Sequence, residues 1–437
     1  YSTFVLNYLI INMSSGYNIT KRSLEAIKNR INIGEFIHAI SNKKTLNSQD
    51  SPPTEGRNTN DGVKKRQDFL LSKTGKEYPH LFNQNVITDA SQVNGNCENF
   101  IGTAQIPIGI IGPLHIVGTA AQGDFYVPLA TTEGALVASY HRGAKASRMC
   151  GGITSICFLE GVQRSPVFRF DNMGEMGKFL IFAIENSEKF QEVISSGSSH
   201  AKILDVKFNI EGNQLIINIE YYTADAAGQN MVTICTDILC KWLVENSPTK
   251  PNIWFVESNY SGDKKAAAVS FTHVRGKKVS AEAHLSKEVV EKILRCKPED
   301  MVQYWQSSTI GVIQSGSIGA QGHVANGLTA LFIATGQDIA CISEASVGIT
   351  RMELTNNGGV YVSVTLPNLI VGTVGGGTGL PTQRECLEML DCYGNGKAQK
   401  FAEIAAGLAL AGEISIAAAI ASGQFSQAHQ KFGRKKS

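Results

Sequence analysis

The C-terminal part of the chain carries a long helical pattern built mostly from small and aliphatic residues. Residues 402–431 are rich in alanine and glycine, with isoleucine and leucine between them. A helix that is apolar on all sides has to be buried, and small side chains let its neighbours approach closely. Residues 317–335 show a second pattern of the same kind. We therefore expect both helices to pack centrally in a large core.

Length and composition are those of an ordinary globular protein. A chain of 437 residues exceeds what one core usually serves, so two or three domains are expected. The content of 43% hydrophobic and 18% charged residues is typical of such proteins. The formal net charge of +2 creates no field that would favour nucleic acid as a partner. Nine cysteines without a CxxC spacing favour reduced thiols, and we expect no metal site.

The N-terminal region alternates between helical patterns and a segment that cannot pack. Apolar residues at helical spacing predict helices over residues 22–39 and 64–71. Residues 42–62 contain almost nothing apolar and predict an exposed loop. Because the chain begins with Tyr1 and has no basic leader, we expect it to be a fragment whose N-terminus lies upstream.

A hairpin pattern marks a separate module in the middle of the chain. Strand-like runs at residues 204–210 and 215–222 flank a Glu-Gly-Asn turn, and residues 229–244 have helical periodicity. Two strands and a helix within such a short stretch predict a small α+β domain over residues 166–255.

Four polar residues stand where a charge has a local explanation as well as a catalytic one. Glu133 follows two threonines at the start of a helix predicted over residues 133–146, where it could simply complement the helix dipole. Lys264 lies in an Asp-Lys-Lys turn, and such charges are usually solvated. Asp338 stands between two apolar runs, where an unpaired charge would be costly. His429 lies near a helix C-terminus, where a surface cation is common.

The strongest binding signal is a glycine loop at residues 372–378. The sequence Gly-Thr-Val-Gly-Gly-Gly-Thr follows a predicted strand at residues 360–365 and precedes a helix that starts near Pro381. Consecutive glycines let backbone N–H groups approach an anionic ligand, and a tight structural turn is the alternative. The common nucleotide and hydrolase fingerprints, such as GxGxxG and GxSxG, are absent.

Six short motifs occur in one order that resembles 3-hydroxy-3-methylglutaryl-coenzyme A (HMG-CoA) reductases of class I, the eukaryotic type. They are Glu-Asn-Phe-Ile-Gly at 98–102, Thr-Thr-Glu-Gly at 131–134, Asp-Ala-Ala-Gly at 225–228, Asp-Lys-Lys at 263–265, Gly-Gln-Asp at 336–338 and the glycine loop. The resemblance covers residues 63–434. It implies reduction of (S)-HMG-CoA to mevalonate and coenzyme A by two successive hydride transfers from NADPH, in isoprenoid and sterol precursor biosynthesis. NADH is the less favoured nucleotide.

The resemblance also implies an α+β architecture, with a large domain around a long central helix, an inserted small α+β NADP-binding domain and a helical N-terminal domain. The expected boundaries are 1–95 for the helical domain, 96–165 and 256–437 for the large domain, and 166–255 for the inserted domain. A homodimer or homotetramer with active sites at the dimer interface is expected. So is a cytosolic catalytic portion that a missing N-terminal anchor attaches to the endoplasmic reticulum membrane.

The family resemblance distributes the chemistry over four residues. Lys264 is expected to stabilise the developing oxyanion, and His429 to protonate the departing coenzyme A thiolate. Glu133 is expected to protonate mevaldehyde. Asp338 is expected to raise the pKa of Glu133 while it pairs with Lys264.

The same resemblance implies two sets of binding residues. The substrate-binding residues are Arg164, Lys265, His323 and Asn326 in the substrate pocket, and Ser139, His141 and Arg142 near coenzyme A. The cofactor-binding residues are Ser198, Asp225, Gly228, Asn230, Met231, Gly375, Gly376, Gly377 and Thr378.

Several positions depart from the family pattern. Glu257 and Ser307 stand where many members carry a serine and a lysine, which weakens anion binding as carried over. Ser199 replaces a basic residue beside Ser198, so Lys202 becomes the candidate for the NADPH 2′-phosphate. Lys435 replaces a regulatory serine, and we expect no equivalent phosphorylation switch at Ser437.

Two other functions stay open at this point. One is a different nicotinamide-dependent oxidoreductase that uses the glycine loop for its cofactor. The other, suggested by Glu257 and Ser307, is an inactive binding or scaffold relative that keeps the fold.

Overall fold

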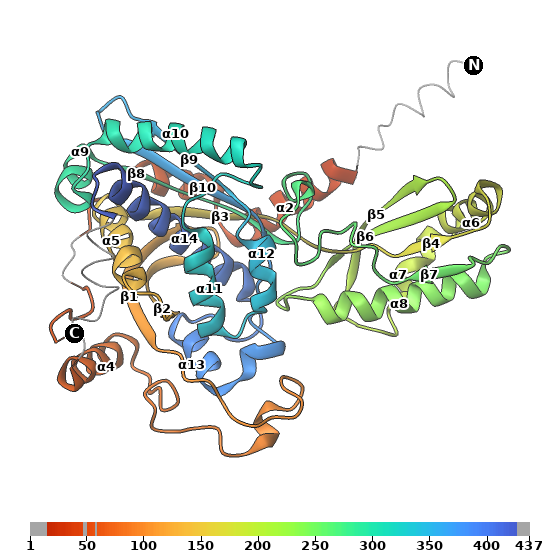
Figure 1. The fold of residues 1–437 in the computed structure, drawn as a ribbon, viewed down its shortest axis with the longest axis horizontal. Helices are drawn as coiled ribbons and strands as arrows, with labels where there is room; N and C mark the ends of the chain where they lie inside the picture. Colours follow the sequence, from red (N-terminus) through yellow and green to blue (C-terminus); the bar gives the residue numbers. More distant parts are fainter. Residues whose placement is uncertain (1–14, 47–49, 57–58, 426–437) are drawn as a thin grey trace. The chain divides into compact units, whose positions relative to one another are not determined.

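The computed structural model describes residues 15–46, 50–56 and 59–425, and the chain divides into two compact units (Figure 1). Unit 1 consists of Tyr1–Phe36, Phe158–Thr223 and Gln229–Ser261. Unit 2 consists of Ile37–Cys157, Ala224–Gly228 and Gly262–Ser437. Both units combine helices with antiparallel strands, so the predicted α+β class is confirmed. The domain boundaries stay predictions, and residues 1–95 are shared between the two units.

Unit 1 is built around the predicted hairpin. Strand β5 (Lys202–Glu211) pairs antiparallel with β6 (Gln214–Tyr222), which confirms that expectation. The other elements of the unit are α2 (Ser15–Arg30), the end of β3 (Ile153–Arg164), β4 (Val167–Arg169), α6 (Met173–Glu185), η2 (Ser187–Lys189), α7 (Phe190–Ile194), α8 (Gln229–Asn246) and β7 (Ile253–Phe255). Strands β3 and β4 each pair antiparallel with β6, and β7 pairs antiparallel with β4.

The core of unit 1 lies between the sheet and its helices. Leu239 and Leu243 of α8 are buried in one cluster with Leu215 and Ile217 of β6 and Phe179 of α6. Because these residues alternate along β6 and recur at helical spacing along α8, one face of each element is buried in the core. The helix predicted over residues 229–244 is confirmed.

Unit 2 contains most of the helices. Its elements before the central helix include α3 (Ile33–Ser41, which begins in unit 1), α4 (Asn60–Thr74), η1 (Ala90–Val93), β1 (Ile108–Gly118), β2 (Gln122–Ala130), α5 (Leu136–Met149), the start of β3, η3 (Ala268–Phe271), β8 (Gly276–Leu285), α9 (Lys287–Val289), the π-helical turn η4 (Val290–Leu294) and α10 (Pro298–Ser315). There follow α11 (Val324–Thr335), η5 (Ile339–Cys341), α12 (Ile342–Ala345), β9 (Ile349–Leu354), β10 (Val360–Leu369), η6 (Gly376–Gly379), α13 (Pro381–Met389) and α14 (Ala398–Ala421). Strand β1 pairs antiparallel with β2, and β10 pairs antiparallel with both β8 and β9.

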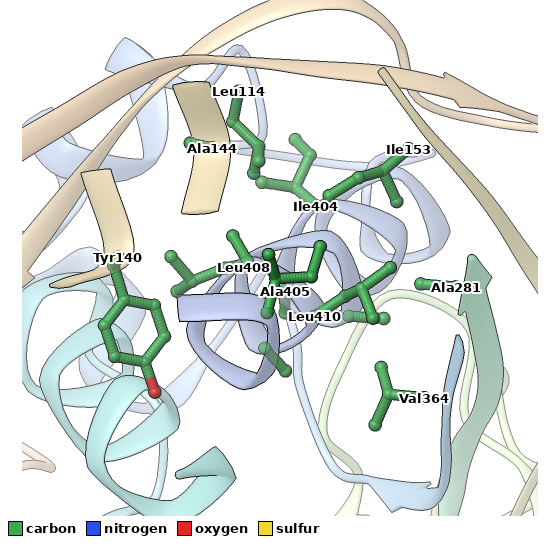
Figure 2. Packing of buried hydrophobic residues seen from close by; sticks show 14 of the residues in the cluster. Leu114, Tyr140, Ala144, Ile153, Ala281, Val364, Ile404, Ala405, Leu408 and Leu410 are labelled. Atoms are coloured by element: carbon green, nitrogen blue, oxygen red, sulfur yellow. The ribbon is translucent and has the colours of Figure 1, made fainter. Parts of the chain in front are cut away.

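Helix α14 is the central helix that its small residues predict. Figure 2 shows Ala405 and Leu408 of α14 among side chains that include Tyr140 of α5 and Val364 of β10. A Cβ atom on Gly412 would lie 2.4 Å from a ring carbon of Tyr140, so only glycine permits this approach. The helix is long and apolar enough to span a membrane, but 83% of its most apolar window is buried inside the protein.

Four predicted helix boundaries are wrong. The helix predicted over residues 22–39 is two helices, because the Asn32 side chain accepts hydrogen bonds from the N–H groups of Gly34 and Glu35 and starts α3 anew. The pattern at 317–335 forms a helix only from Val324, since the preceding backbone bonds to Glu413 instead. The pattern at 133–146 begins at Leu136. Helix α14 ends at Ala421, before Gly423 at φ +69°.

Candidate active site

Lys264 and Asp338 form an ion pair on unit 2. The Nζ atom of Lys264 lies 3.0 Å from Oδ2 of Asp338, and the two side chains are 43% and 37% exposed. Asp338 also caps η5, since its Oδ1 accepts the N–H of Ala340. The hydrogen bond that Lys264 donates to the Asp338 carboxylate raises the pKa of the Lys264 ammonium. The pairing implied by the family resemblance is therefore present, and it leaves a cation accessible to a ligand.

The glycine loop lies beside this pair. Gln337, next to Asp338, accepts the N–H of Gly372 at 2.8 Å and donates to the carbonyl of the same glycine at 3.0 Å. Gly375 and Gly376 have φ angles of +73° and +54°, and nothing lies within 4 Å of the position a Cβ atom would take. The exposed backbone therefore suits close approach by an anionic group. The Thr378 hydroxyl is buried and donates to the Gly375 carbonyl, which stabilises the loop.

The Asp225 carboxylate stabilises the start of α14. It accepts the N–H groups of Gly396 at 2.8 Å and Ala398 at 3.0 Å, at the start of α14. A negative charge there complements the helix dipole. The backbone carbonyl of Asp225 accepts the N–H of Thr373, so the segment that ends at Gly228 runs beside the glycine loop. The two cofactor motifs of unit 2 are adjacent, but the Asp225 carboxylate is already engaged.

Glu133 lies in a turn before α5, and the prediction that it opens that helix is wrong. Its N–H donates to the Thr131 hydroxyl at 3.0 Å, and the helix begins only at Leu136. The Glu133 carboxylate accepts a hydrogen bond of 2.8 Å from the Asn326 side chain, in the first turn of α11. Glu133 is exposed. Two predicted site residues, one from each segment, thus form a second polar pair.

His323 stands beside Asn326 at the start of α11 and is nearly buried. Its N–H donates to the buried Glu413 carboxylate at 2.6 Å, and its carbonyl accepts the Tyr140 hydroxyl. The rings of Tyr140 and His323 lie 4.9 Å apart between centroids. The backbone at the start of α11 is therefore held by buried partners.

The predicted coenzyme A residues lie on α5, and two of them contact the central helix. Ser139 and Arg142 both donate to the hydroxyl of Ser415, and Arg142 also donates to its carbonyl at 2.6 Å. Burial lowers the pKa of Arg142. His141 accepts a long contact of 3.5 Å from the N–H of Gly112. A role for these three residues in coenzyme A binding stays a prediction.

The two polar pairs lie at opposite ends of α11. Asn326 is in its first turn and Asp338 follows its last, and at ~1.5 Å per residue the helix separates them by about 15 Å. Within the described residues, no hydrogen bond or ion pair joins Glu133 to Lys264 or Asp338. The direct action of Asp338 on Glu133 that the resemblance implies is thus not provided within one chain.

The substrate and cofactor residues of unit 1 have partners of their own. Arg164 forms an ion pair of 3.0 Å with Glu257, which stands where many family members carry a serine, and both side chains are largely buried. The Ser198 hydroxyl accepts the N–H of Ala201, which stabilises its turn. Asn230 and Met231 lie in the first turn of α8. Glu257 therefore supplies the negative charge that balances Arg164.

A cavity of about 530 Å³ lies in unit 1 beside the predicted 2′-phosphate position. Ser199 and Lys202 line it, together with Arg22 and Arg30 of α2. One acidic residue, Glu160, faces the same space. The cavity thus has an excess of basic side chains, which suits an anion.

The remaining predicted residues are placed as follows. Lys265 is exposed, and its Nζ donates to the Asp263 carbonyl at 2.8 Å. Ser307 is exposed on α10. His429, Lys435 and Ser437 lie outside the described residues.

Two buried charged residues beneath Lys264 were not predicted. Glu344 of α12 is fully buried, and Arg275 is 3% exposed at its side chain. Glu344 follows the apolar run 339–342 after a single serine, and a charge so close to an apolar run was the available signal.

Comparison with known proteins identifies the family. The model of the Hydroxymethylglutaryl-coenzyme A reductase family matches residues 62–434. The 3-hydroxy-3-methylglutaryl-coenzyme A reductase of Methanocaldococcus jannaschii is 41% identical over 375 residues, covering 84% of this chain and 92% of that protein. That of Aeropyrum pernix is 37% identical over 429 residues, covering 97% and 99%. The class II reductase from Streptococcus pneumoniae bound to NADPH shares the fold, with a TM-score of 0.66 at 18% identity over 82% of this chain and 96% of that one. On the family match and these identities, the chain belongs to the hydroxymethylglutaryl-coenzyme A reductase family.

Proposed function

We propose that this chain reduces HMG-CoA to mevalonate and coenzyme A, consuming two NADPH and two protons, with Lys264 as the cation at the reacting carbonyl. The observation that carries the proposal is the exposed Lys264–Asp338 pair at 3.0 Å, held beside an open glycine loop. The family assignment and the NADPH-bound relative of the same fold support the reaction and the cofactor.

Lys264 suits the first half of the reaction. NADPH supplies the hydride that adds to the thioester carbonyl, and negative charge then develops on the carbonyl oxygen. An ammonium near that oxygen stabilises the charge, and more strongly once the substrate excludes water. Lysine is protonated at neutral pH in any case, and Asp338 raises the pKa of Lys264 further, which stabilises the charged form.

Proton transfers complete the reaction. When the C–S bond breaks, the thiolate leaves and takes a proton, and we assign this donor to His429. The aldehyde carbon accepts the second hydride, and its oxygen takes a proton, which we assign to Glu133. The hydrogen bond from Asn326 orients the Glu133 carboxyl for this step.

We propose that the active enzyme is a homodimer or a homotetramer of such dimers. The separation of the two polar pairs along α11 supports this, because one reacting carbonyl cannot contact both ends of the helix in one chain. Both pairs are exposed at their reactive atoms. A second copy that brings its own Glu133 to Lys264 would complete the constellation.

Recognition of the NADPH 2′-phosphate is assigned to the basic cavity of unit 1. Lys202 and Arg22 line it from two different elements, and Ser199 adds a hydroxyl. Cations and hydroxyls are the groups that bind phosphate. Ser198, Asn230 and Met231 stay predictions for the rest of the cofactor.

We place the chain in class I of the family. The support is the low identity of 18% to the class II structure, which is less than half of the 41% and 37% shared with the two archaeal relatives. A cytosolic catalytic portion is proposed with this assignment. The eukaryotic type and an endoplasmic reticulum anchor stay predictions, because both of these relatives are archaeal.

The function is tested by incubating the purified protein with HMG-CoA and NADPH, and measuring both NADPH loss and mevalonate. We expect two NADPH per mevalonate, and a loss of at least about a hundredfold in Lys264→Ala. Lys292→Ala, which removes a surface lysine from a similar ion pair of 2.7 Å, is the matched control and should behave as wild type. Absence of mevalonate with either NADPH or NADH would favour the inactive relative.

A further inference from the structure

Lys264 is held at two points by one short helical segment, residues 338–345. Its side chain pairs with Asp338, which caps η5. Its backbone N–H donates to Oε1 of Glu344 at 3.0 Å, and Glu344 lies in α12, directly after η5. The same segment therefore sets both the backbone and the ammonium of this lysine.

The backbone of Lys264 needs such support. Its φ angle is +56°, in the left-handed region that a residue with a Cβ atom rarely adopts. Residues persist there only when their surroundings hold them, and they concentrate at functional sites. The bond to Glu344 holds the peptide nitrogen of this residue in place. Relaxation to a negative φ would redirect the whole side chain.

Arg275 completes the support from below. Its Nε donates to Oε2 of Glu344 at 2.8 Å, and its Nη2 donates to Oδ1 of Asp263 at 2.7 Å. The guanidinium thus connects Glu344 to the residue that precedes Lys264 in the chain. Asn368 accepts the Arg275 backbone N–H, which fixes the arginine to the strand β10.

Glu344 and Arg275 form a buried ion pair, although well-packed apolar residues are often at least as stable in such a place. Glu344 is 0% and Arg275 3% exposed at the side chain. Burial raises the pKa of Glu344, and Arg275 opposes that shift. Buried ion pairs often add little net stability, but they impose a defined geometry.

We propose that Glu344 and Arg275 are positioning residues that aim the Lys264 ammonium at the reacting carbonyl. They act on Lys264 indirectly, through the backbone N–H of Lys264 and the side chain of Asp263. The inference rests on the proposed function, because it needs Lys264 to be the cation at the carbonyl. A displacement of about an ångström at such a group can reduce the rate a hundredfold.

The proposal is tested with Glu344→Gln and Arg275→Lys. In Glu344→Gln the amide cannot accept from both Lys264 and Arg275, so one contact is lost. We expect kcat to fall about ten- to a hundredfold, with the KM for HMG-CoA within about twofold of wild type, because the lost interaction acts in the transition state. Arg275→Lys keeps the positive charge but cannot contact both Glu344 and Asp263 as arginine does, and its kcat should also fall.

The pH profile separates positioning from a general loss of structure. Asp338, Cys341 and Asp263 are the titratable groups that act on the Lys264 ammonium, and Asp338 raises its pKa most. If Lys264 moves away from Asp338, its pKa falls towards the ordinary value. The alkaline limb of kcat should therefore move to lower pH in both variants, which a purely structural defect would not cause.

Glu385→Gln is the matched control. Glu385 is 8% exposed and accepts two backbone N–H groups, those of His80 and Leu81. Its substitution should lower the melting temperature and leave kcat per folded molecule and the alkaline limb unchanged.

The outcomes separate this inference from the proposed function. If Lys264→Ala retains full turnover, the proposed function fails. If Lys264→Ala is inactive while Glu344→Gln and Arg275→Lys keep the wild-type kcat and pH profile, only the positioning role fails. If Glu344→Gln does not fold, the kcat and the pH profile of Arg275→Lys decide whether the positioning role holds. An equal loss of kcat in Glu385→Gln would also overturn the positioning role.

Discussion

Asn326 and Asp338 lie at opposite ends of the twelve-residue helix α11, and each holds a different member of the predicted catalytic set. Asn326 binds Glu133 at 2.8 Å, and Asp338 pairs with Lys264 at 3.0 Å. A helix is a rigid spacer on this scale, so α11 holds the two pairs apart within one chain. This relationship motivates a test of shared active sites.

Mixing two inactive variants should restore activity. We expect Lys264→Ala and Glu133→Gln to be inactive separately. If each site combines Glu133 of one copy with Lys264 of another, a mixed dimer contains one intact site and one doubly altered site. Random exchange of subunits yields half mixed dimers, so about a quarter of the wild-type activity should return. The measurement is mevalonate formation after the two proteins have been unfolded and refolded together.

The control for this experiment is each variant refolded alone and the wild type carried through the same cycle. No recovery in the mixture, with full recovery of the wild type, would place Glu133 and Lys264 of one site in a single chain.

Lys202→Ala should change the choice between nucleotides. Since Lys202 lines the basic cavity that we assign to the 2′-phosphate, its loss should raise the KM for NADPH by about tenfold, which corresponds to ~1.4 kcal/mol. The KM for NADH should stay unchanged, because NADH lacks that phosphate. Steady-state kinetics with both nucleotides provide the measurement. Lys241→Ala, which removes an exposed lysine of α8 in the same unit, is the control. Equal effects on both nucleotides would rule out the assignment.

Glu220 should make the stability of the protein depend on pH. Burial raises its pKa from 4.5 to about 7, with Asp205 adding to the shift and Lys207 and Arg22 opposing it. Between these values the folded state binds a proton that the unfolded state has lost, so stability is full below about pH 4.5 and falls as pH rises towards 7. The difference is on the order of 3 kcal/mol.

Urea unfolding at pH 5 and pH 8 checks this. Glu220→Gln should remove most of the decrease in unfolding free energy between the two pH values, while Glu211→Gln, at an exposed position of β5, should keep it. The same decrease in wild type and Glu220→Gln would show that another group is responsible.

Local patterns in the sequence predicted the elements whose structure depends on local chemistry. The alternation of β5 and β6 and the turn between them are set by neighbouring residues, and the hairpin is where it was predicted. The small residues of α14 dictated a buried central helix, because no other environment accommodates a helix without a polar face. Its length was overestimated, since Gly423 ends it at a positive φ that the periodicity alone does not reveal.

Long-range partners account for the failures. The small-residue pattern of residues 317–323 resembles a helix, but Glu413, far along the chain, accepts the N–H groups of Gly322 and His323 and holds them outside α11. Asp225 stays a predicted cofactor residue, but the sequence did not show that its carboxylate accepts the N–H groups at the start of α14. A sequence does not show which buried group will satisfy a given backbone donor.

The candidate site likewise has features that the sequence predicts and features that only the tertiary structure shows. The residue types that the chemistry needs, a lysine, two carboxylic acids and a glycine loop, are evident from the sequence and from the family it resembles. Only the tertiary structure shows that α11 separates Glu133 from Lys264, and that Glu344 and Arg275 hold Lys264 from beneath. Composition and periodicity determine which segments must be buried, because hydrophobic burial depends on residue type. The partner of each buried charge is decided by folding, because hydrogen bonds and ion pairs require contacts at about 3 Å between residues distant in the chain.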